Sequence, residues 1–205
     1  MRTLLTAIAL ATLAVAQPPG EGWRQLFNGK DLNGWNNVGN QEWSVDDDGV
    51  LQGKAVTDDY GYLETDRDYK NFSLNLKFQC IGTGNSGVYF HTRFEPGTAD
   101  VSQGAQFEID CTEGQHTAGV YGFGRAWIVW PATEKESVVR RGAWNEMTVT
   151  VHGNRYISEL NGVPMVDFTD PHAPYLQGTI ALQLHSGGEG NMMFRDIWVR
   201  ELPDE

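Results

Sequence analysis

The stretch that decides the fold is Gln103-Gly104-Ala105-Gln106-Phe107-Glu108-Ile109-Asp110-Cys111-Thr112-Glu113-Gly114. Side chains alternate between the two sides of a β-strand, so this stretch predicts one strand with a polar face and an apolar face. The polar face carries Gln106, Glu108 and Asp110, and the apolar face carries Phe107, Ile109 and Cys111. We therefore expect a sheet with one face in a core and the other face available for chemistry.

The polar face of this strand brings carboxyl groups together. A one-residue bulge at Cys111-Thr112, as is common beside active sites, would return Glu113 to the face of Glu108 and Asp110. Crowded carboxylates repel one another, so one of them is expected to hold its proton at neutral pH, as acid-base catalysis requires. The alternative, from the strand alone, is a solvated acidic edge strand without a chemical role.

The N-terminus has the pattern of a secretory signal. Met1-Arg2-Thr3 precedes an apolar run from Leu4 to Ala16, which ends in Ala14-Val15-Ala16. This pattern predicts a signal peptide over residues 1–16 with cleavage after Ala16, and a single domain over residues 17–205. The run is too short to span a bilayer, and no later stretch is apolar for long enough. We expect a soluble protein that is secreted or periplasmic.

The charge of the chain limits its partners. The formal net charge is -12, whereas binding to nucleic acid depends on clustered Lys and Arg. We therefore expect no nucleic-acid partner and no binding to an anionic membrane surface. Uncharged ligands such as neutral sugars remain open, and the composition indicates no oligomeric state.

The two cysteines, Cys80 and Cys111, both fall on the apolar faces of expected strands. In an exported chain they favour a disulfide, which would stabilise the fold by roughly 3 to 4 kcal/mol in the chain-entropy model. Two buried thiols that pack as small apolar groups are the alternative. A zinc site is not indicated, because neither cysteine has a second ligand at the usual spacing.

Short alternating runs separated by glycine-rich turns indicate an all-β sandwich or barrel. The clearest strand is 72–80, in which Phe and Leu alternate with polar residues. Asp46-Asp47-Asp48-Gly49 reads as a hairpin turn rather than a cation site, because tight turns favour Asp for local hydrogen bonds. Further hairpins are expected at Gly153-Asn154 and Asn161-Gly162.

Two other expected strands also have a polar face. In 87–93, Tyr89, His91 and Arg93 share one face, and a histidine and an arginine there could orient a sugar oxygen and stabilise an oxyanion. In 178–188, Gln183 and His185 alternate with apolar residues. The alternatives are an ordinary solvent-exposed face for the first strand and a hydrogen-bonded rim histidine for the second.

Trp127 and Trp130 lie in an irregular segment and cannot share one side of an ideal strand. At the rim of a cleft, a tryptophan makes a flat platform for a sugar ring. Alternatively both residues belong to the core, and we expect this of at least one of them.

Several motifs, in order along the chain, resemble the 3-keto-disaccharide hydrolase family. They are residues 22–35 (GWRQLFNGKDLNGW), 84–90 (GNSGVYF), Trp144-Asn145, Leu160-Asn161-Gly162 and Arg195-Asp196-Ile197. The resemblance covers essentially all of 17–205. It implies a concanavalin A-like jelly-roll sandwich of two antiparallel sheets, whose concave sheet holds the site. It also implies an exported enzyme that acts on glycosides oxidised at C3 of the sugar.

The resemblance also suggests roles. Glu108 or Asp110 would be the base that removes the C2 proton, Arg93 or His91 would stabilise the enolate, and Glu113 or His185 would act near the leaving group. The expected sugar contacts are Tyr89, Gln106, Gln183, Trp127 and Trp130. No cofactor is certain, although a divalent cation at the enolate could replace some of these donors.

The chain departs from the family at the opening stretch. The family's strand runs Glu-x-Gln-x-x-Asp, whereas Glu108, Asp110 and Glu113 form Glu-x-Asp-x-x-Glu. This pattern resembles laminarinase- and lichenase-like glycoside hydrolases, so a retaining β-glucanase that uses Glu108 and Glu113 is one alternative. A non-catalytic carbohydrate-binding module is another.

Overall fold

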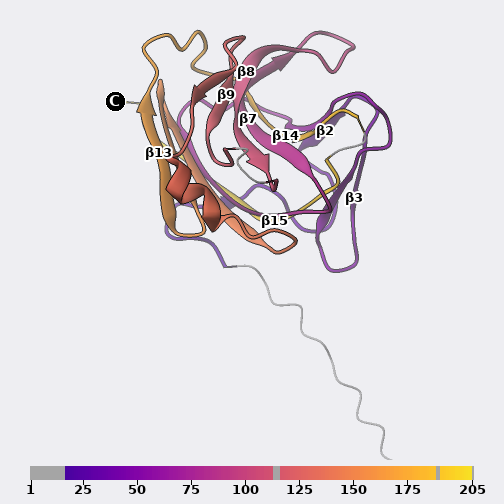
Figure 1. Ribbon diagram of the computed structural model, residues 1–205. Coiled ribbons are helices and arrows are strands. Elements are labelled where there is room, and N and C mark those ends of the chain that lie inside the picture. The colour runs from indigo at the N-terminus through magenta and orange to yellow at the C-terminus, as the bar shows by residue number, and fades with distance from the viewer. Residues whose placement is uncertain (1–16, 113–115, 188–189, 205) are drawn as a thin grey trace, which may run out of the picture.

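The computed structural model describes residues 17–112, 116–187 and 190–204, which form two antiparallel β-sheets (Figure 1). The eight-stranded sheet has the order β13 (Val163–Thr169), β12 (Arg155–Leu160), β11 (Asn145–His152), β6 (Phe72–Cys80), β15 (Met192–Glu201), β4 (Leu51–Lys54) and β3 (Glu42–Val45), with β1 (Arg24–Gln25) paired to β15. The seven-stranded sheet has the order β10 (Trp127–Val129), β9 (Val120–Gly122), β8 (Val101–Asp110), β7 (Asn85–Phe94), β14 (Thr179–Leu184), β5 (Gly61–Thr65) and β2 (Trp35–Val38). One 3-10 helix, η1 (Thr133–Val138), completes the described part. The predicted jelly-roll sandwich is confirmed.

The core lies between the two sheets. It is formed by the apolar halves of the alternating strands, as in β6, where Phe72, Leu74, Leu76 and Phe78 are fully buried. The apolar half of β8, Phe107 and Ile109, packs into the same core from the other sheet. The polar half of β8 therefore points away from the core, as the alternation predicts.

The turn of the β3–β4 hairpin is stabilised by hydrogen bonds to an aspartate side chain. In the β3–β4 hairpin, the Asp46 carboxylate accepts the backbone N–H groups of Asp48 and Val50 at 3.0 and 2.9 Å. Gly49 has a φ of 74°, in the left-handed region that glycine adopts without steric cost. The acidic triplet is thus a turn, as predicted.

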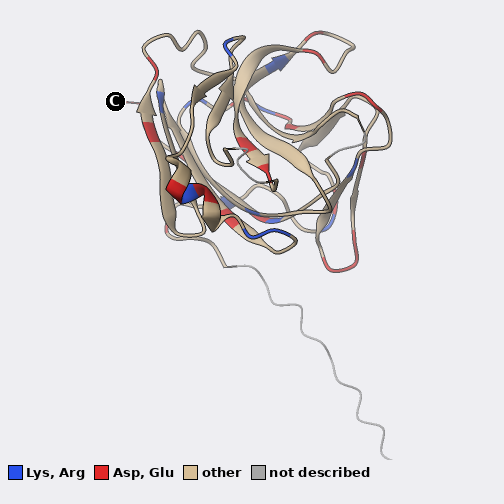
Figure 2. Ribbon diagram, viewed as in Figure 1, with Lys and Arg blue, Asp and Glu red and all other residues tan. Residues whose placement is uncertain are grey.

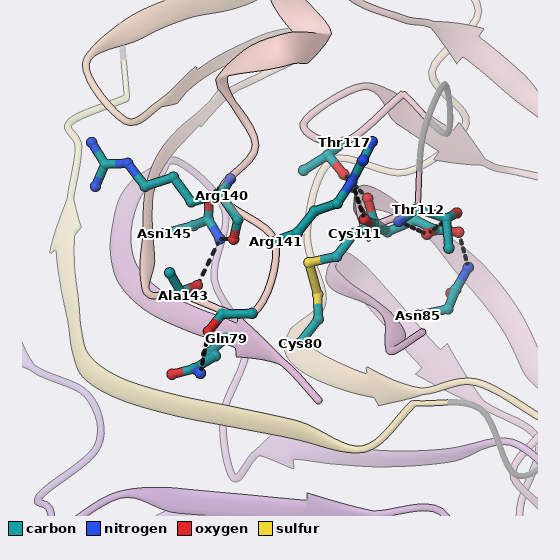
Figure 3. Close-up of a disulfide and its surroundings, with 12 residues drawn as sticks. Gln79, Cys80, Asn85, Cys111, Thr112, Thr117, Arg140, Arg141, Ala143 and Asn145 are labelled. Atoms are coloured by element: carbon teal, nitrogen blue, oxygen red, sulfur yellow. Dashed lines mark hydrogen bonds between the residues drawn. A yellow bond between two sulfur atoms is a disulfide. The ribbon is translucent and has the colours of Figure 1, made fainter. Parts of the chain in front are cut away.

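A disulfide between Cys80 and Cys111 joins the two sheets (Figure 3). Cys80 ends β6 in one sheet, and Cys111 follows the last residue of β8 in the other. The carbonyl oxygen of Cys111 also accepts a hydrogen bond of 3.1 Å from Arg141 Nε. The predicted bridge is confirmed, and it fixes the end of β8 that bears Glu108 and Asp110.

Acidic residues lie in both layers and in the loops, including the end of β8 (Figure 2). Within the described residues, there is no helix whose length and apolar character would let it cross a membrane.

Candidate functional site

A cleft of about 460 Å³ lies on the face of the seven-stranded sheet that points away from the core. This volume is within the usual range for a small-molecule site. The cleft brings together seven of the predicted residues: Tyr89, Gln106, Glu108, Asp110, Trp127, Gln183 and His185. The other lining residues are Tyr60, Tyr62, Asn85, Ala99, Asp100, Val101 and Tyr121.

Strand register explains why residues far apart in sequence meet here. Across the sheet, Tyr89 on β7 pairs with Gln106 on β8, and Gln106 pairs with Tyr121 on β9. Tyr121 in turn pairs with Trp127 on β10. Paired residues project on the same side of a sheet, so these side chains form a continuous row along the cleft.

Glu108 is buried in the floor of the cleft, with 7% of its surface exposed. Burial, and secondarily the charge of Asp110, raise the pKa of its carboxyl from 4.5 to about 8. The Gln106 amide donates to its Oε2 at 3.0 Å, which favours the charged form, but burial dominates. The expectation that one carboxyl holds its proton at neutral pH is therefore met at Glu108, with burial as a larger cause than repulsion.

Asp110 differs from Glu108 because hydrogen-bond donors surround it. Asn85 Nδ2 donates to Oδ2 at 2.8 Å, and the backbone N–H of Thr112 donates to Oδ1 at 2.7 Å (Figure 3). These bonds hold the Asp110 side chain in place at the end of β8. β8 ends at Asp110, so Cys111 and Thr112 do not form the predicted bulge within the strand. Glu113 lies outside the described residues.

Gly87 makes room for the Gln106 amide beside Glu108. It pairs with Glu108 across β7 and β8. A Cβ at Gly87 would lie 1.8 Å from Gln106 Oε1, so the Gln106 amide occupies the space that a side chain would take. The glycine thereby allows Gln106 to reach the Glu108 carboxylate.

Two buried tyrosines, Tyr89 and Tyr62, line the cleft together with Glu108. Burial raises the pKa of Tyr89 and of Tyr62, so both phenols keep their protons at neutral pH. Their rings meet edge to face at 5.4 Å, and Gln183 Nε2 lies 3.4 Å from the Tyr89 hydroxyl. Within the described residues, the side-chain oxygens of Gln106, Gln183 and Asn85 have no hydrogen-bond partner. These oxygens are therefore positioned to accept hydrogen bonds from hydroxyl groups.

His185 lies at the edge of the cleft. Its Nε2 is 3.3 Å from the Tyr60 hydroxyl, and its Nδ1 is 3.1 Å from the Ser186 carbonyl oxygen. The Tyr60 ring packs edge to face against the imidazole at 4.9 Å. This placement agrees with the prediction for His185 and adds Tyr60 as a partner.

The prediction that His91 shares the polar face of Tyr89 is wrong. The register of β7 shifts between Phe90 and Arg93, and His91 has a φ of 52°, so the alternation breaks at this residue. His91 is fully buried, and its ring nitrogens lie 2.9 and 3.1 Å from the carbonyl oxygens of Lys70 and Tyr175. It is a structural residue.

The predicted placement of Arg93 in the site is also wrong. The guanidinium forms a two-point ion pair with Asp68, in which Nη1 lies 2.6 Å from Oδ1. Arg93 lines a different hollow, of about 320 Å³, beside Glu64 and Thr179. No Arg or Lys occurs among the described residues that line the cleft.

The tryptophans form an aromatic corner at one end of the cleft. Trp127 is half-buried and lines the cleft, whereas Trp130 is 52% exposed and does not. The expectation that at least one of them is core is therefore wrong. Trp130 stacks on His116 at 5.5 Å, and His116 contacts Trp127 and hydrogen-bonds Glu136 of η1. The platform prediction thus fits Trp127 and not Trp130.

Sequence reasoning missed several cleft residues. Tyr62 could have been found, because Gly61–Thr65 alternates in the same way as β8. Tyr60, Asp100 and Tyr121 enter from loops or a short strand, for which periodicity carries no signal. No group of three or more His, Cys, Asp or Glu in the described part of the chain converges as metal ligands.

Comparison with known proteins assigns the family. Residues 22–200 match the family described as the 3-keto-alpha-glucoside-1,2-lyase-like domain. The chain belongs to this family. The lyase-like domain therefore accounts for nearly all of the described chain and places it among carbohydrate-related proteins.

Individual relatives are more distant. A 3-keto-disaccharide hydrolase of Bacteroides thetaiotaomicron is 30% identical over 79 residues, which are 34% of this chain and 27% of that protein. A proposed glycosyl hydrolase of Parabacteroides distasonis has a TM-score of 0.70 at 22% identity. The similarity covers 89% of the present chain and 95% of the Parabacteroides chain. The carbohydrate-binding module CBM66 of Bacillus subtilis has a TM-score of 0.63 at 16% identity, covering 82% and 96%. The two structural similarities establish the fold alone.

Proposed function

We propose that this protein cleaves 3-keto-glycosides by removing the proton at C2 and expelling the substituent at C1. The observation that supports the proposal best is Glu108, a buried carboxyl with a pKa raised to about 8 in the floor of a cleft of sugar size. A base is more effective when its pKa approaches that of the proton it removes. The membership of the lyase-like family agrees with this chemistry.

The proposed reaction has two stages. The ionised Glu108 carboxylate takes the C2 proton, and the electron pair of the C2–H bond forms an enolate with the C3 ketone. The enolate then forms a C1–C2 double bond as the C1–O bond breaks, and the departing oxygen takes up a proton. Water adds across the double bond, so the net products are a 3-keto sugar and the alcohol that was the leaving group.

In this proposal the hydroxyl groups of Tyr89 and Tyr62 donate hydrogen bonds to the enolate, the role that the sequence analysis gave to Arg93 or His91. Tyr89 and Tyr62 keep their protons; Glu108 contributes to the raised pKa of Tyr89, and the Tyr62 ring packs against the Tyr89 ring in the same cleft. Neutral donors fixed in a buried site stabilise a developing oxyanion without reorganising. A divalent cation at the enolate stays a prediction, which chelation with EDTA before the assay would check.

His185 is the candidate proton donor to the leaving oxygen. The Tyr60 hydroxyl beside its Nε2 holds the ring at the edge of the cleft, away from Glu108 on β8. Burial, and secondarily the neighbouring Asp110, raise the pKa of Glu108, which makes the Glu108 carboxylate a stronger base.

The decisive experiment uses 3-keto-trehalose as substrate. We expect glucose release, a kcat/KM that rises with pH toward a plateau above about 8, and a slower reaction when C2 carries deuterium. Glu108→Gln should abolish turnover, and Glu159→Gln, an exposed glutamate of β12 in the other sheet, should not.

Three outcomes would contradict the proposal. Cleavage of laminarin or lichenan, abolished by Glu108→Gln, would favour the retaining β-glucanase. Sugar binding without turnover of any substrate would favour the non-catalytic module. Turnover of 3-keto-trehalose with no deuterium effect at C2 and an unchanged rate in Glu108→Gln would exclude Glu108 as the base.

Export remains a proposal that rests on residues 1–16. The mature protein, expressed from the full chain in a bacterium and recovered from periplasm or medium, should begin at Gln17 on N-terminal sequencing. A cytoplasmic product that retains Met1 would contradict it.

A further inference from the structure

Tyr121 and Trp127 form an aromatic wall at one end of the cleft. Their rings meet edge to face at 5.4 Å, and their backbones pair across β9 and β10. β10 is the edge strand of the seven-stranded sheet, so no further strand of the described chain pairs with its outer side. The position of the aromatic wall therefore depends on the short hairpin that carries it.

The turn that joins β9 to β10 has an unfavourable backbone conformation. Positive φ angles of 131°, 51°, 69° and 59° occur at Gly122, Phe123, Gly124 and Ala126. Phe123 and Ala126 have a Cβ atom, which makes the left-handed region costly for them. A turn of this kind keeps its conformation only when neighbouring contacts hold it.

The Arg125–Asp170 ion pair supplies such a contact. Arg125 lies within the turn, and its Nη1 and Nη2 donate to the two carboxylate oxygens of Asp170, with Nη1 3.1 Å from Oδ1. Asp170 directly follows β13, which is the edge strand of the eight-stranded sheet. The ion pair thus ties the turn to the opposite layer of the sandwich.

Asp170 is a rigid anchor because it is buried and hydrogen-bonded on several sides. Only 1% of its surface is exposed, and its Oδ1 also accepts the backbone N–H of His172 at 2.9 Å. Its backbone N–H donates to the carbonyl oxygen of Asn154 at 2.8 Å, and its own carbonyl oxygen accepts from Asn154 Nδ2 at 2.7 Å. A two-point ion pair to a carboxylate held in this way fixes the guanidinium group in position and direction.

We propose that Arg125 is a positioning residue: through Asp170 it holds the β9–β10 turn in its strained conformation and thereby determines the position of Tyr121 and Trp127 in the cleft. Neither Arg125 nor Asp170 is among the described residues that line the cleft, so the pair acts only through the hairpin. The consequence for KM rests on the proposed cleavage of 3-keto-glycosides, whereas the consequence for the position of the aromatic wall does not.

The kinetics of Arg125→Lys test the effect on substrate binding. Lysine keeps the charge beside Asp170 but cannot make the two-point contact. A wall that contacts the sugar equally in the ground state and the transition state contributes uniform binding, so KM for 3-keto-trehalose should rise about tenfold with kcat within about twofold. Arg155→Lys is the matched control, because Arg155 forms a two-point pair with Asp167 between β12 and β13 and should leave KM unchanged.

Ala126→Gly tests whether the ion pair acts through the strained backbone. Glycine adopts a φ of 59° without steric cost, and Ala126 is exposed, so the change removes strain without removing core packing. The turn should then keep its conformation with less help from the ion pair. In the Arg125→Lys background, Ala126→Gly should return KM to within about threefold of wild type. A pair that only stabilised the fold would give no such rescue.

Fluorine NMR of protein labelled with 5-fluorotryptophan observes the aromatic wall without any turnover. The Trp127 resonance, assigned by its loss in Trp127→Phe, should shift or broaden in Arg125→Lys. It should regain its wild-type position when Ala126→Gly is added. The resonance of Trp43, which lies in the core between the sheets, should stay unchanged in every variant.

The spectrum separates failure of this inference from failure of the proposed function. If wild-type protein turns over no substrate, a displaced Trp127 resonance in Arg125→Lys still supports the inference. If Arg125→Lys does not fold, the double variant Arg125→Gln and Asp170→Asn takes its place with the same expectation, because it leaves no buried charge unpaired. A Trp127 resonance that matches wild type, an equal rise of KM in Arg155→Lys, or no rescue by Ala126→Gly would overturn the inference.

Discussion

The pKa of Glu108 predicts that the Glu108 carboxyl lowers the stability of the fold at alkaline pH, and that Glu108→Gln removes this loss of stability. Glu108 is 7% exposed, and burial with the nearby charge of Asp110 raises its pKa to about 8 in the folded state. In the unfolded chain the pKa returns to 4.5. The folded state therefore binds a proton that the unfolded state releases between these two values.

The sign of the effect follows from this difference. The contribution of Glu108 to stability is fully present below pH 4.5 and is lost as the pH rises through 8. The slope is about 1.4 kcal/mol per pH unit within this window, so the free energy of unfolding should fall by about 4 kcal/mol between pH 5 and pH 9. Glutamine has nearly the shape of a protonated glutamate, so the variant lacks this dependence.

Urea unfolding of wild type and Glu108→Gln from pH 5 to pH 9 would measure the effect. The two proteins should agree within about 1 kcal/mol at pH 5, and the variant should gain about 4 kcal/mol on wild type by pH 9. Glu159→Gln, an exposed position, serves as the control and should follow wild type throughout. Parallel curves for wild type and Glu108→Gln would refute a raised pKa at Glu108.

Three further perturbations test other parts of the description. Gly87→Ala should displace the flexible Gln106 amide. The free energy of unfolding should change by less than about 1 kcal/mol, while kcat/KM should fall at least about tenfold. Unchanged kinetics would contradict the role of Gly87. Replacing Cys80 and Cys111 together by Ala should lower the free energy of unfolding by about 3 to 4 kcal/mol, because the disulfide links residues 31 apart in sequence. Equal urea midpoints for the wild-type protein with and without dithiothreitol would argue against this stabilisation by the disulfide. Arg93→Gln should leave kcat/KM within about twofold, because Arg93 is outside the cleft; a loss above about tenfold would return it to the site.

The sequence predicts the polar face of β8 correctly because the period of two holds from Gln106 to Asp110. In a strand without a bulge, successive side chains must point to opposite faces of the sheet. Burial of Phe107 in the core therefore directs Glu108 into the cleft on the other face. The same reasoning fails in β7, where the left-handed conformation of His91 shifts the register. A bulge at a non-glycine residue leaves no signal in the alternation of residue types.

The remaining errors concern residues placed by long-range contacts. Tyr60 and Asp100 reach the cleft from loops whose paths depend on the buried Gln41 and on packing against the sheet. Trp127 and Trp130 are large apolar residues that a hydrophobicity argument assigns to the core, yet both remain partly exposed beside His116. Their surroundings are set by neighbours distant in sequence, which composition and spacing do not encode.

The composition of the cleft floor is best explained by function, because each of its features costs stability. A buried carboxyl, a second carboxyl group beside it and a glycine, Gly87, within β7 are all unfavourable in a sheet that only had to fold. The disulfide at Cys111 and the donors on Asp110 offset this cost at the same end of β8. Unfavourable residues that specific neighbours stabilise are the pattern expected of a catalytic site. In this chain the pattern occurs around Glu108, and not around the Arg93–Asp68 pair or His91.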